Sequence, residues 1–405
     1  MGELGGEDIS HDELRDLITR LTGYLIRDSK STTAVEQFRY STTTFSKSTI
    51  VFEVFTMEFL KNYWYPLLLS SEVSGDKPHS TLLLGEPLVI FRDNNGKAIC
   101  LHDACPHQGV PLSLGKVKDG KVECAYHGWQ FGASGECEKI PCLEDGKLPK
   151  SAKCRFAYPT EERLGVIWVF AGSPGMAPPL RLPEGTTEAG WVHEVIVREQ
   201  EIPHKLMIAG GLDFAHFPFL HTKSIASKKQ RDYLRSLEVT LTDYEHGLTM
   251  MVKNADGEDY NDFVYSFEPP CLVKVAIEPK PGWRLIASDY FVPLTENRTR
   301  LFVFEARDWL TWNPLVSWQL RRKANQILDE DLPILYAQTE WHKNGYGDWN
   351  CTVKPDLLSL RYRQWYDRKA RGVATPTMSH SYEFEDHFLE DQETDQRMPL
   401  ERVRS

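Results

Sequence analysis

The sequence predicts an α+β protein in which a small all-β domain precedes a larger domain of helices packed on an antiparallel sheet. Three observations support this class. From about Phe59 to Phe170, short apolar runs alternate with Gly, Asp-Asn and Pro, a spacing typical of β-hairpins. A stretch rich in Pro and Gly at 172–185 then marks a domain boundary. Beyond it, strand-like segments flank one long helix-like segment, Pro314 to His342.

The elements follow in order along the chain. An N-terminal region at 1–58 opens with a capping box, Ser10 to Glu13, and leucines at helical spacing, so we expect an amphipathic helix followed by a Ser/Thr-rich arm. The β domain at 59–172 and the larger domain at 173–372 come next, and an acidic tail fills 373–405. Strands are expected within 82–91, 121–131, 165–170, 236–245 and 301–310.

Composition excludes several classes of protein. The 405 residues suffice for two or three domains, and 41% apolar with 26% charged residues exclude disorder, collagen and a small disulfide scaffold. The net charge of −11 argues against nucleic acid or an anionic membrane as the main partner.

Two further features bear on location. The most apolar window, 49–69, contains Glu53, Glu58 and Lys61, so no membrane span is expected. The acidic N-terminus has no apolar signal core, and eight cysteines in such a chain predict thiols or metal ligands rather than disulfides. We therefore expect a cytoplasmic protein.

The first metal-binding pattern is C-x-H, sixteen residues, then C-x-x-H. It supplies Cys105, His107, Cys124 and His127 on two turns of the β domain. Two thiolates and two imidazoles suit either one tetrahedral zinc or a Rieske 2Fe–2S cluster, with two Cys on one iron and two His on the other. The remaining alternative is that four core residues have this spacing by chance.

The pair C-P-H and C-x-Y-H-G-W resembles the two ligand loops of the Rieske family closely. Respiratory-chain members add a disulfide, but those positions here hold Val110 and Tyr126. The resemblance thus implies the oxygenase and ferredoxin branch. We expect the other cysteines to be buried structural thiols: Cys100, Cys137, Cys142, Cys154, Cys271 and Cys351.

The second pattern lies in GGLDFAHFPFLH at 210–221. His216 and His221 would lie about 140° apart on an ideal helix, too far for one metal. Pro218 must distort that helix and could bring the imidazoles together. Taken alone, two surface or core histidines explain the pattern better.

Together the two patterns resemble the Rieske non-heme iron oxygenases, nearest to the branch of chlorophyllide and pheophorbide oxygenases and their microbial relatives. The resemblance implies a helix-grip, START-like catalytic domain and an Fe(II) site with two His and one carboxylate. The family's pattern of Glu-Asp followed seven residues later by Gln fits Glu330, Asp331 and Gln338, so the resemblance implies Asp331 as that carboxylate, with Asp329 as the fallback. Glu330 and Asp329 are otherwise expected to be solvated helix acids.

The resemblance also gives Asp213 a role. It would connect His216 to the Rieske His127 of a neighbouring subunit, which implies a head-to-tail homotrimer. Family members often have Asn where this chain has Gly210. Gly210 and Gly211 are expected to make the start of this helix flexible. Phe214, Phe217 and Phe219 are expected to pack in the core, with a pocket wall as the alternative.

The implied activity is hydroxylation or oxidative demethylation of a C–H bond in a small organic substrate, using O2 and electrons from a ferredoxin or an NAD(P)H-dependent reductase. Cis-dihydroxylation is the second outcome. A non-enzymatic Rieske electron carrier and a zinc-stabilised interaction protein are the competing classes, and neither needs the second metal pattern. The strands between Asn261 and Phe304 are expected to line the substrate site.

Overall fold

The computed structural model describes residues 59–143, 147–225, 237–244, 247–254, 263–346, 351 and 353–370. The expected N-terminal helix and arm and the acidic tail at 373–405 lie outside these residues. No helix in the described ranges is both long enough and apolar enough to cross a membrane.

The N-terminal part is built from three small antiparallel sheets. The first has the order β1-β11-β10, the second β2-β3-β4-β9 and the third β5-β6-β7-β8. The strands are β1 (Trp64–Leu69), β2 (His79–Leu83), β3 (Glu86–Arg92), β4 (Ala98–His102), β5 (Lys116–Lys118), β6 (Lys121–Glu123), β7 (Gln130–Phe131), β8 (Cys137–Lys139), β9 (Ala157–Tyr158), β10 (Thr160–Arg163) and β11 (Val166–Phe170). Short 3-10 turns are η2 (Ser70–Glu72), η3 (Leu112–Leu114) and η4 (Pro174–Met176).

The expected hairpins are present because their turn residues suit tight reversals. Asp93 accepts hydrogen bonds from the N–H groups of Asn95 and Lys97 through Oδ1, and Gly96 adopts φ 76°, which a side chain would strain. This turn joins β3 to β4. A separate apolar cluster, which includes Phe91, Leu112 and Phe131, supports the two turns that carry the Cys-His pattern.

The C-terminal part is one seven-stranded antiparallel sheet with helices on it. The sheet order is β12-β18-β17-β16-β15-β14-β13. Its strands are β12 (Val192–Gln200), β13 (Leu237–Tyr244), β14 (Gly247–Asn254), β15 (Phe263–Glu268), β16 (Leu272–Lys280), β17 (Trp283–Thr295) and β18 (Arg298–Arg307). The helices are α2 (His204–Gly211), α3 (Phe217–Leu220), α5 (Pro314–Lys343) and α6 (Leu357–Ala370), with η5 (Lys354–Asp356) before the last.

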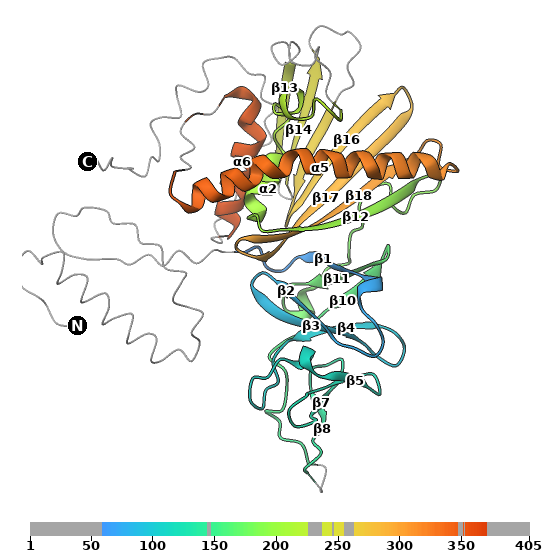
Figure 1. Ribbon diagram of the computed structural model, residues 1–405, viewed down its shortest axis with the longest axis vertical. Helices are drawn as coiled ribbons and strands as arrows, with labels where there is room; N and C mark the ends of the chain where they lie inside the picture. The colour runs from blue at the N-terminus through green and yellow to red at the C-terminus, as the bar shows by residue number, and fades with distance from the viewer. Residues whose placement is uncertain are drawn as a thin grey trace, which may run out of the picture. The chain divides into compact units, whose positions relative to one another are not determined.

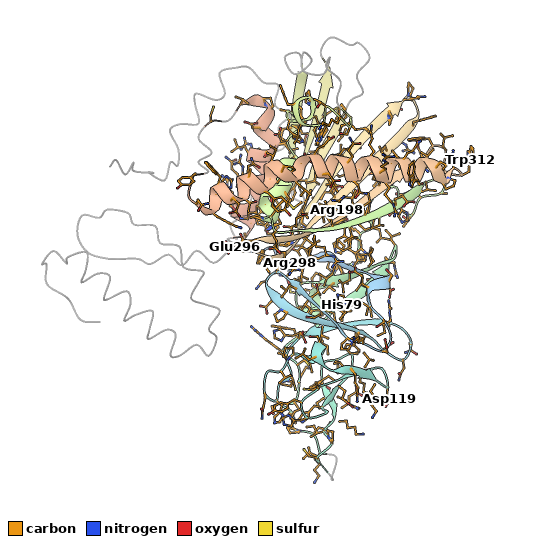
Figure 2. The ribbon with its side chains drawn as sticks, viewed as in Figure 1. His79, Asp119, Arg198, Glu296, Arg298 and Trp312 are labelled. Atoms are coloured by element: carbon orange, nitrogen blue, oxygen red, sulfur yellow. The ribbon has the colours of Figure 1, made fainter. Side chains whose placement is uncertain are left out.

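Helix α5 lies across one face of the large sheet (Figure 1). It begins where the sequence predicts, because Asn313 accepts a hydrogen bond from the N–H of Leu315 and Pro314 occupies the first turn. Arg198 of β12, labelled in Figure 2, lies beside the helix and donates hydrogen bonds to Asn325 and Asp329. The α+β class, with a small β domain and a helix-on-sheet domain, is thus confirmed.

Backbone hydrogen bonds and an ion pair join the small sheets to the large one. Leu84 and Gly85, in the β2–β3 turn, donate to the carbonyls of Pro293 and Leu294 at 2.9 Å. Arg300 of β18 binds both carboxylate oxygens of Glu72 at 2.6 Å, and both side chains are largely buried.

Candidate metal centres

The two Cys-His loops have the same backbone hydrogen-bond pattern. In the first, Gly109 donates to the carbonyl of Cys105 and Cys105 donates to that of Val110. In the second, Gly128 donates to the carbonyl of Cys124, and Cys124 to that of Trp129. Both glycines adopt positive φ, 73° and 70°, which closes each loop without a side-chain clash. Two six-residue loops of one design therefore present the four side chains.

The four side chains converge in pairs of different burial. Cys105 and Cys124 are buried, and the thiol of Cys124 hydrogen-bonds that of Cys105. His107 and His127 are exposed, with ring centroids 4.6 Å apart, and Trp129 stacks on His107 at 4.6 Å. Inner thiols and outer imidazoles are the arrangement that a Rieske cluster requires, with one iron buried and the other near the surface.

The thiol chemistry fits a bound metal. Burial raises the pKa of Cys105 to about 11, so the thiolate needs a compensating positive charge. All eight cysteines are unpaired, as expected from the sequence. Four of the six non-ligand cysteines are buried, but the expectation is wrong for Cys142 and Cys351, which are exposed.

The second pattern does not form a single kinked helix. Helix α2 ends at Gly211, and a separate one-turn helix, α3, begins at Phe217. His216 immediately precedes α3 and His221 immediately follows it, with Pro218 in its first turn. The helix is interrupted near Pro218, as expected. Gly210 and Gly211 were expected at the start of the helix that carries the histidines, but they form the end of α2.

This break brings the two imidazoles and Asp331 of α5 together. The Nε2 atoms of His216 and His221 are 3.1 Å apart, and Oδ1 of Asp331 lies 3.6 and 3.3 Å from them. Three donors bound at about 2.1 Å to one ion would be separated by about 3.0 Å in octahedral and about 3.4 Å in tetrahedral geometry. The triangle therefore fits one metal ion and leaves coordination positions open, as the two-His, one-carboxylate set does for Fe(II).

The two other acids of α5 behave differently from each other. The side chain of Asp329 is 60% exposed and pairs with Arg198. The fallback ligand is therefore engaged by Arg198 and not by the two histidines. Glu330 was expected to be a solvated acid, and that expectation is wrong. Its side chain is only 14% exposed, and Oε2 lies 3.0 Å from Nδ1 of the fully buried His221.

Glu330 is held by a small network that the sequence did not reveal. Ser224 donates to Oε2 at 2.6 Å, and Gln326 donates to Oε1 at 3.1 Å. Burial alone would raise the pKa of Glu330, but the hydrogen bonds from Ser224, His221 and Gln326 lower it. An ionised Glu330 favours the His221 tautomer with hydrogen on Nδ1, which leaves Nε2 free for metal. The only signals in the sequence were the i, i+4 spacing of Gln326 and Glu330 and the adjacent Asp331.

Asp213 lies on the other side of His216. Its Oδ2 is 3.7 Å from Nδ1 of His216, and its Oδ1 accepts the N–H of Ala215. A cavity of about 170 Å³ borders Asp213 and is also lined by Gly210 and Gln338. Gln338, Gly210 and Asp213 therefore border the same cavity.

The three phenylalanines near the histidines have different environments. Phe214 is buried, as expected. Phe217 packs edge-on against His216 and His221, at 4.8 and 5.2 Å, and also contacts Tyr265. Phe219 is 58% exposed, so core packing is wrong for that residue.

Comparison with known proteins agrees with a Rieske site and a separate mononuclear iron site in one chain. Residues 63–154 match the Rieske [2Fe-2S] domain family, and residues 201–372 match the vanillate O-demethylase oxygenase C-terminal domain family. The structure is similar to that of dicamba monooxygenase bound to 3,6-dichlorosalicylic acid, with a TM-score of 0.68 and 22% identity over 78% of this chain and 98% of that one. This likeness concerns the fold.

Two relatives come from Arabidopsis thaliana. Chlorophyllide a oxygenase, chloroplastic, is 32% identical over 390 residues, 90% of this chain and 68% of the relative. Protein TIC 55, chloroplastic, is 29% identical over 327 residues, 76% of this chain and 60% of the relative. The family's cofactors are a Rieske 2Fe–2S cluster and a mononuclear iron, and this chain holds both ligand sets. The chain belongs to the Rieske non-heme iron oxygenases, as a catalytic alpha subunit on the branch that includes chlorophyllide a oxygenase, TIC 55 and bacterial relatives.

Proposed function

We propose that this oxygenase inserts one atom of O2 into a C–H bond of a small organic substrate, by hydroxylation or by hydroxylation of a methyl group that is then lost. The second oxygen atom leaves as water, which consumes two electrons and two protons. The observation that carries the proposal is the triangle of His216, His221 and Asp331 in the same chain as a Rieske site. When bound, the cluster supplies single electrons and the ferrous iron activates O2.

We assign the ligands residue by residue. Cys105, His107, Cys124 and His127 hold the cluster, and His216, His221 and Asp331 hold the iron. Glu330 fixes the orientation and tautomer of His221. Burial raises the pKa of Asp331 more than the two histidines lower it. A bound metal cation would stabilise the ionised form of this buried acid.

Asp213 is proposed as the link between two copies of the chain. It lies beside His216 with its side chain partly exposed, and His127 is exposed on its own loop. A carboxylate there can accept a hydrogen bond from each imidazole, so His127 of one copy and His216 of another would be bridged. This arrangement favours a head-to-tail ring, and we propose a homotrimer.

Electrons would come from a separate ferredoxin or NAD(P)H-dependent reductase, because the sequence has no glycine-rich nucleotide loop. The cytoplasmic location stays a prediction from the sequence, while both Arabidopsis relatives carry the word chloroplastic in their names. We propose the residue limits 59–172 for the Rieske domain and 173–372 for the catalytic domain.

The proposal is tested with iron-loaded protein, a surrogate ferredoxin and reductase, and a panel of aromatic methyl ethers and N-methyl compounds under ¹⁸O2. Direct hydroxylation should give a product with one labelled oxygen atom. Demethylation should give formaldehyde in an amount equal to an unlabelled phenol or amine, because the labelled atom leaves with the methyl carbon. Two labelled atoms in one product would instead indicate dihydroxylation. Reoxidation of the cluster without any substrate-dependent O2 uptake across the panel would favour the electron-carrier class.

A further inference from the structure

Two acids of the large sheet each have one carboxylate oxygen that is buried without a partner inside the catalytic domain. Oδ1 of Asp289 on β17 and Oε2 of Glu305 on β18 are inaccessible to solvent and form no hydrogen bond. Each residue as a whole still keeps part of its surface accessible to solvent. Buried polar groups in native proteins nearly always have partners, which makes this pair an exception that calls for a ligand.

Strand register places the two acids close together on one face. Ala287 pairs with Glu305, and Asp289 pairs with Val303. Because paired residues share a face and alternate residues return to it, Asp289 and Glu305 are diagonal neighbours, with Cα atoms about 7–8 Å apart.

The same face leads to the iron ligands. Val273 pairs with Asp289 in the neighbouring strand, and a Cβ on Gly211, at the end of α2, would lie 3.6 Å from Cγ1 of Val273. Tyr265, two strands from β17, contacts Phe217, which packs on both iron histidines. Adjacent strands are about 4.8 Å apart, so Asp289 lies about 10 Å from the strand that meets Phe217, and Glu305, one strand farther away, about 14 Å from it.

Arg321 of α5 lowers the pKa of Glu305, but the pKa is still raised overall. Glu194 of β12 lies directly opposite Glu305, but its carboxylate is engaged by Arg321 of α5. The pKa of Asp289 is raised to about 8, first by burial and then by Glu305 and Asp331, and the pKa of Glu305 is raised to about 7, first by burial and then by Glu194. The residues around Asp289, such as Val273 and Val303, are apolar.

Resting on the proposed oxygenase function, we propose that Asp289 and Glu305 form the polar end of the substrate site and select a substrate with a protonated or N–H-bearing nitrogen. The nitrogen would donate hydrogen bonds to both carboxyl groups while the carbon to be oxidised lies toward the iron. A bound ammonium group would hold both acids in the ionised form, whereas a carboxylate or sulfonate substrate would bring no positive charge to pair with them.

The test is calorimetric binding to iron-loaded holoenzyme under nitrogen at pH 7.5. The probes are two size-matched pairs, 4-methylbenzylamine with 4-methylbenzoate and 2-naphthylmethylamine with 2-naphthoate. We expect the wild-type protein to bind at least one amine about tenfold or more tightly than its carboxylate. In the Asp289→Asn/Glu305→Gln double variant the preference should fall to about threefold or less.

Glu194→Gln is the matched control, because it removes a charge from the same row of the sheet but one that already has a partner. It should keep the amine preference. The single variants Asp289→Asn and Glu305→Gln, each near-isosteric, cover the case in which the double variant fails to fold. Equal affinities in the wild type, a preference for the carboxylates, or an unchanged preference in the variants would overturn the assignment. The iron content of the same preparation is also measured, and a protein that holds no mononuclear iron would overturn the proposed function rather than the amine preference.

Discussion

Glu330 accepts a hydrogen bond from Nδ1 of His221 at 3.0 Å, on the side of the ring opposite the metal-facing Nε2. The contact joins α5 to the residue that follows α3, so the helix that supplies Asp331 also orients the histidine next to it. One turn of α5 therefore positions two of the three iron ligands.

Glu330→Gln should weaken iron binding about 10- to 100-fold, because the carboxylate that holds the His221 tautomer loses its charge. The measurement is the iron dissociation constant of the mononuclear site, by competition with a chelator. Asp329→Asn, which changes an exposed acid one residue away, is the control and should leave the constant unchanged. Equal affinities for the two variants would contradict the role given to Glu330.

Asp213→Ala should lower turnover by about 100-fold or more while iron and sulfide content stay at wild-type values, because only the link between imidazoles is removed. Rapid mixing of the reduced protein with O2 and substrate would show slow reoxidation of the cluster. Asp329→Ala is a suitable control. Wild-type reoxidation in the Asp213 variant would exclude the bridge.

Asp289→Asn should flatten the pH dependence of stability. The pKa of Asp289 is about 8 in the folded protein against an ordinary 3.8, so between these values the folded state holds a proton that the unfolded chain has released. The free energy of unfolding must then fall as pH rises through this window, by up to about 1.4 kcal/mol per pH unit. Melting temperatures from pH 5.5 to 7.5 should fall less steeply in the variant. Parallel curves for the two proteins would contradict the raised pKa of Asp289 in the folded state.

Glu72→Gln should destabilise the protein by about 1–3 kcal/mol, because Arg300 would lose a charged partner in a largely buried contact between the small and large sheets. Chemical denaturation measures the change. Glu161→Gln removes the exposed pair with Arg163 and should cost less than about 0.5 kcal/mol. Similar losses of unfolding free energy in the two variants would mean that the Glu72–Arg300 contact stabilises the protein no more than an exposed ion pair does.

The sequence revealed what is encoded locally. Each Cys-His pair of the Rieske site is separated by only one or two residues, so the spacing alone predicts that the members of a pair share a loop. The pairs are Cys105 with His107 and Cys124 with His127. The α5 start follows from Asn313 and Pro314 for the same reason. His216, His221 and Asp331 were found by resemblance to a family pattern and not by geometry, since an ideal helix would separate the histidines.

What the sequence could not reveal depends on tertiary contacts. Glu330 differs from Asp329 only in which face of α5 meets His221, and that is decided by helix packing. Gly211 ends α2 where the chain passes Phe291 and Val273, a contact with no local signature. Asp289 and Glu305 become neighbours only through the register of β17 and β18, which no local pattern in the sequence specifies.

Metal and sulfide analysis of anaerobically purified protein tests the central claim most directly, with Asp331→Ala beside the wild type. We predict about three irons and two acid-labile sulfides per wild-type chain, and about two irons with the same two sulfides in the variant. Two irons and two sulfides in both proteins, with no gain after Fe(II) is added, would contradict the mononuclear site, and zinc without sulfide would contradict both metal centres.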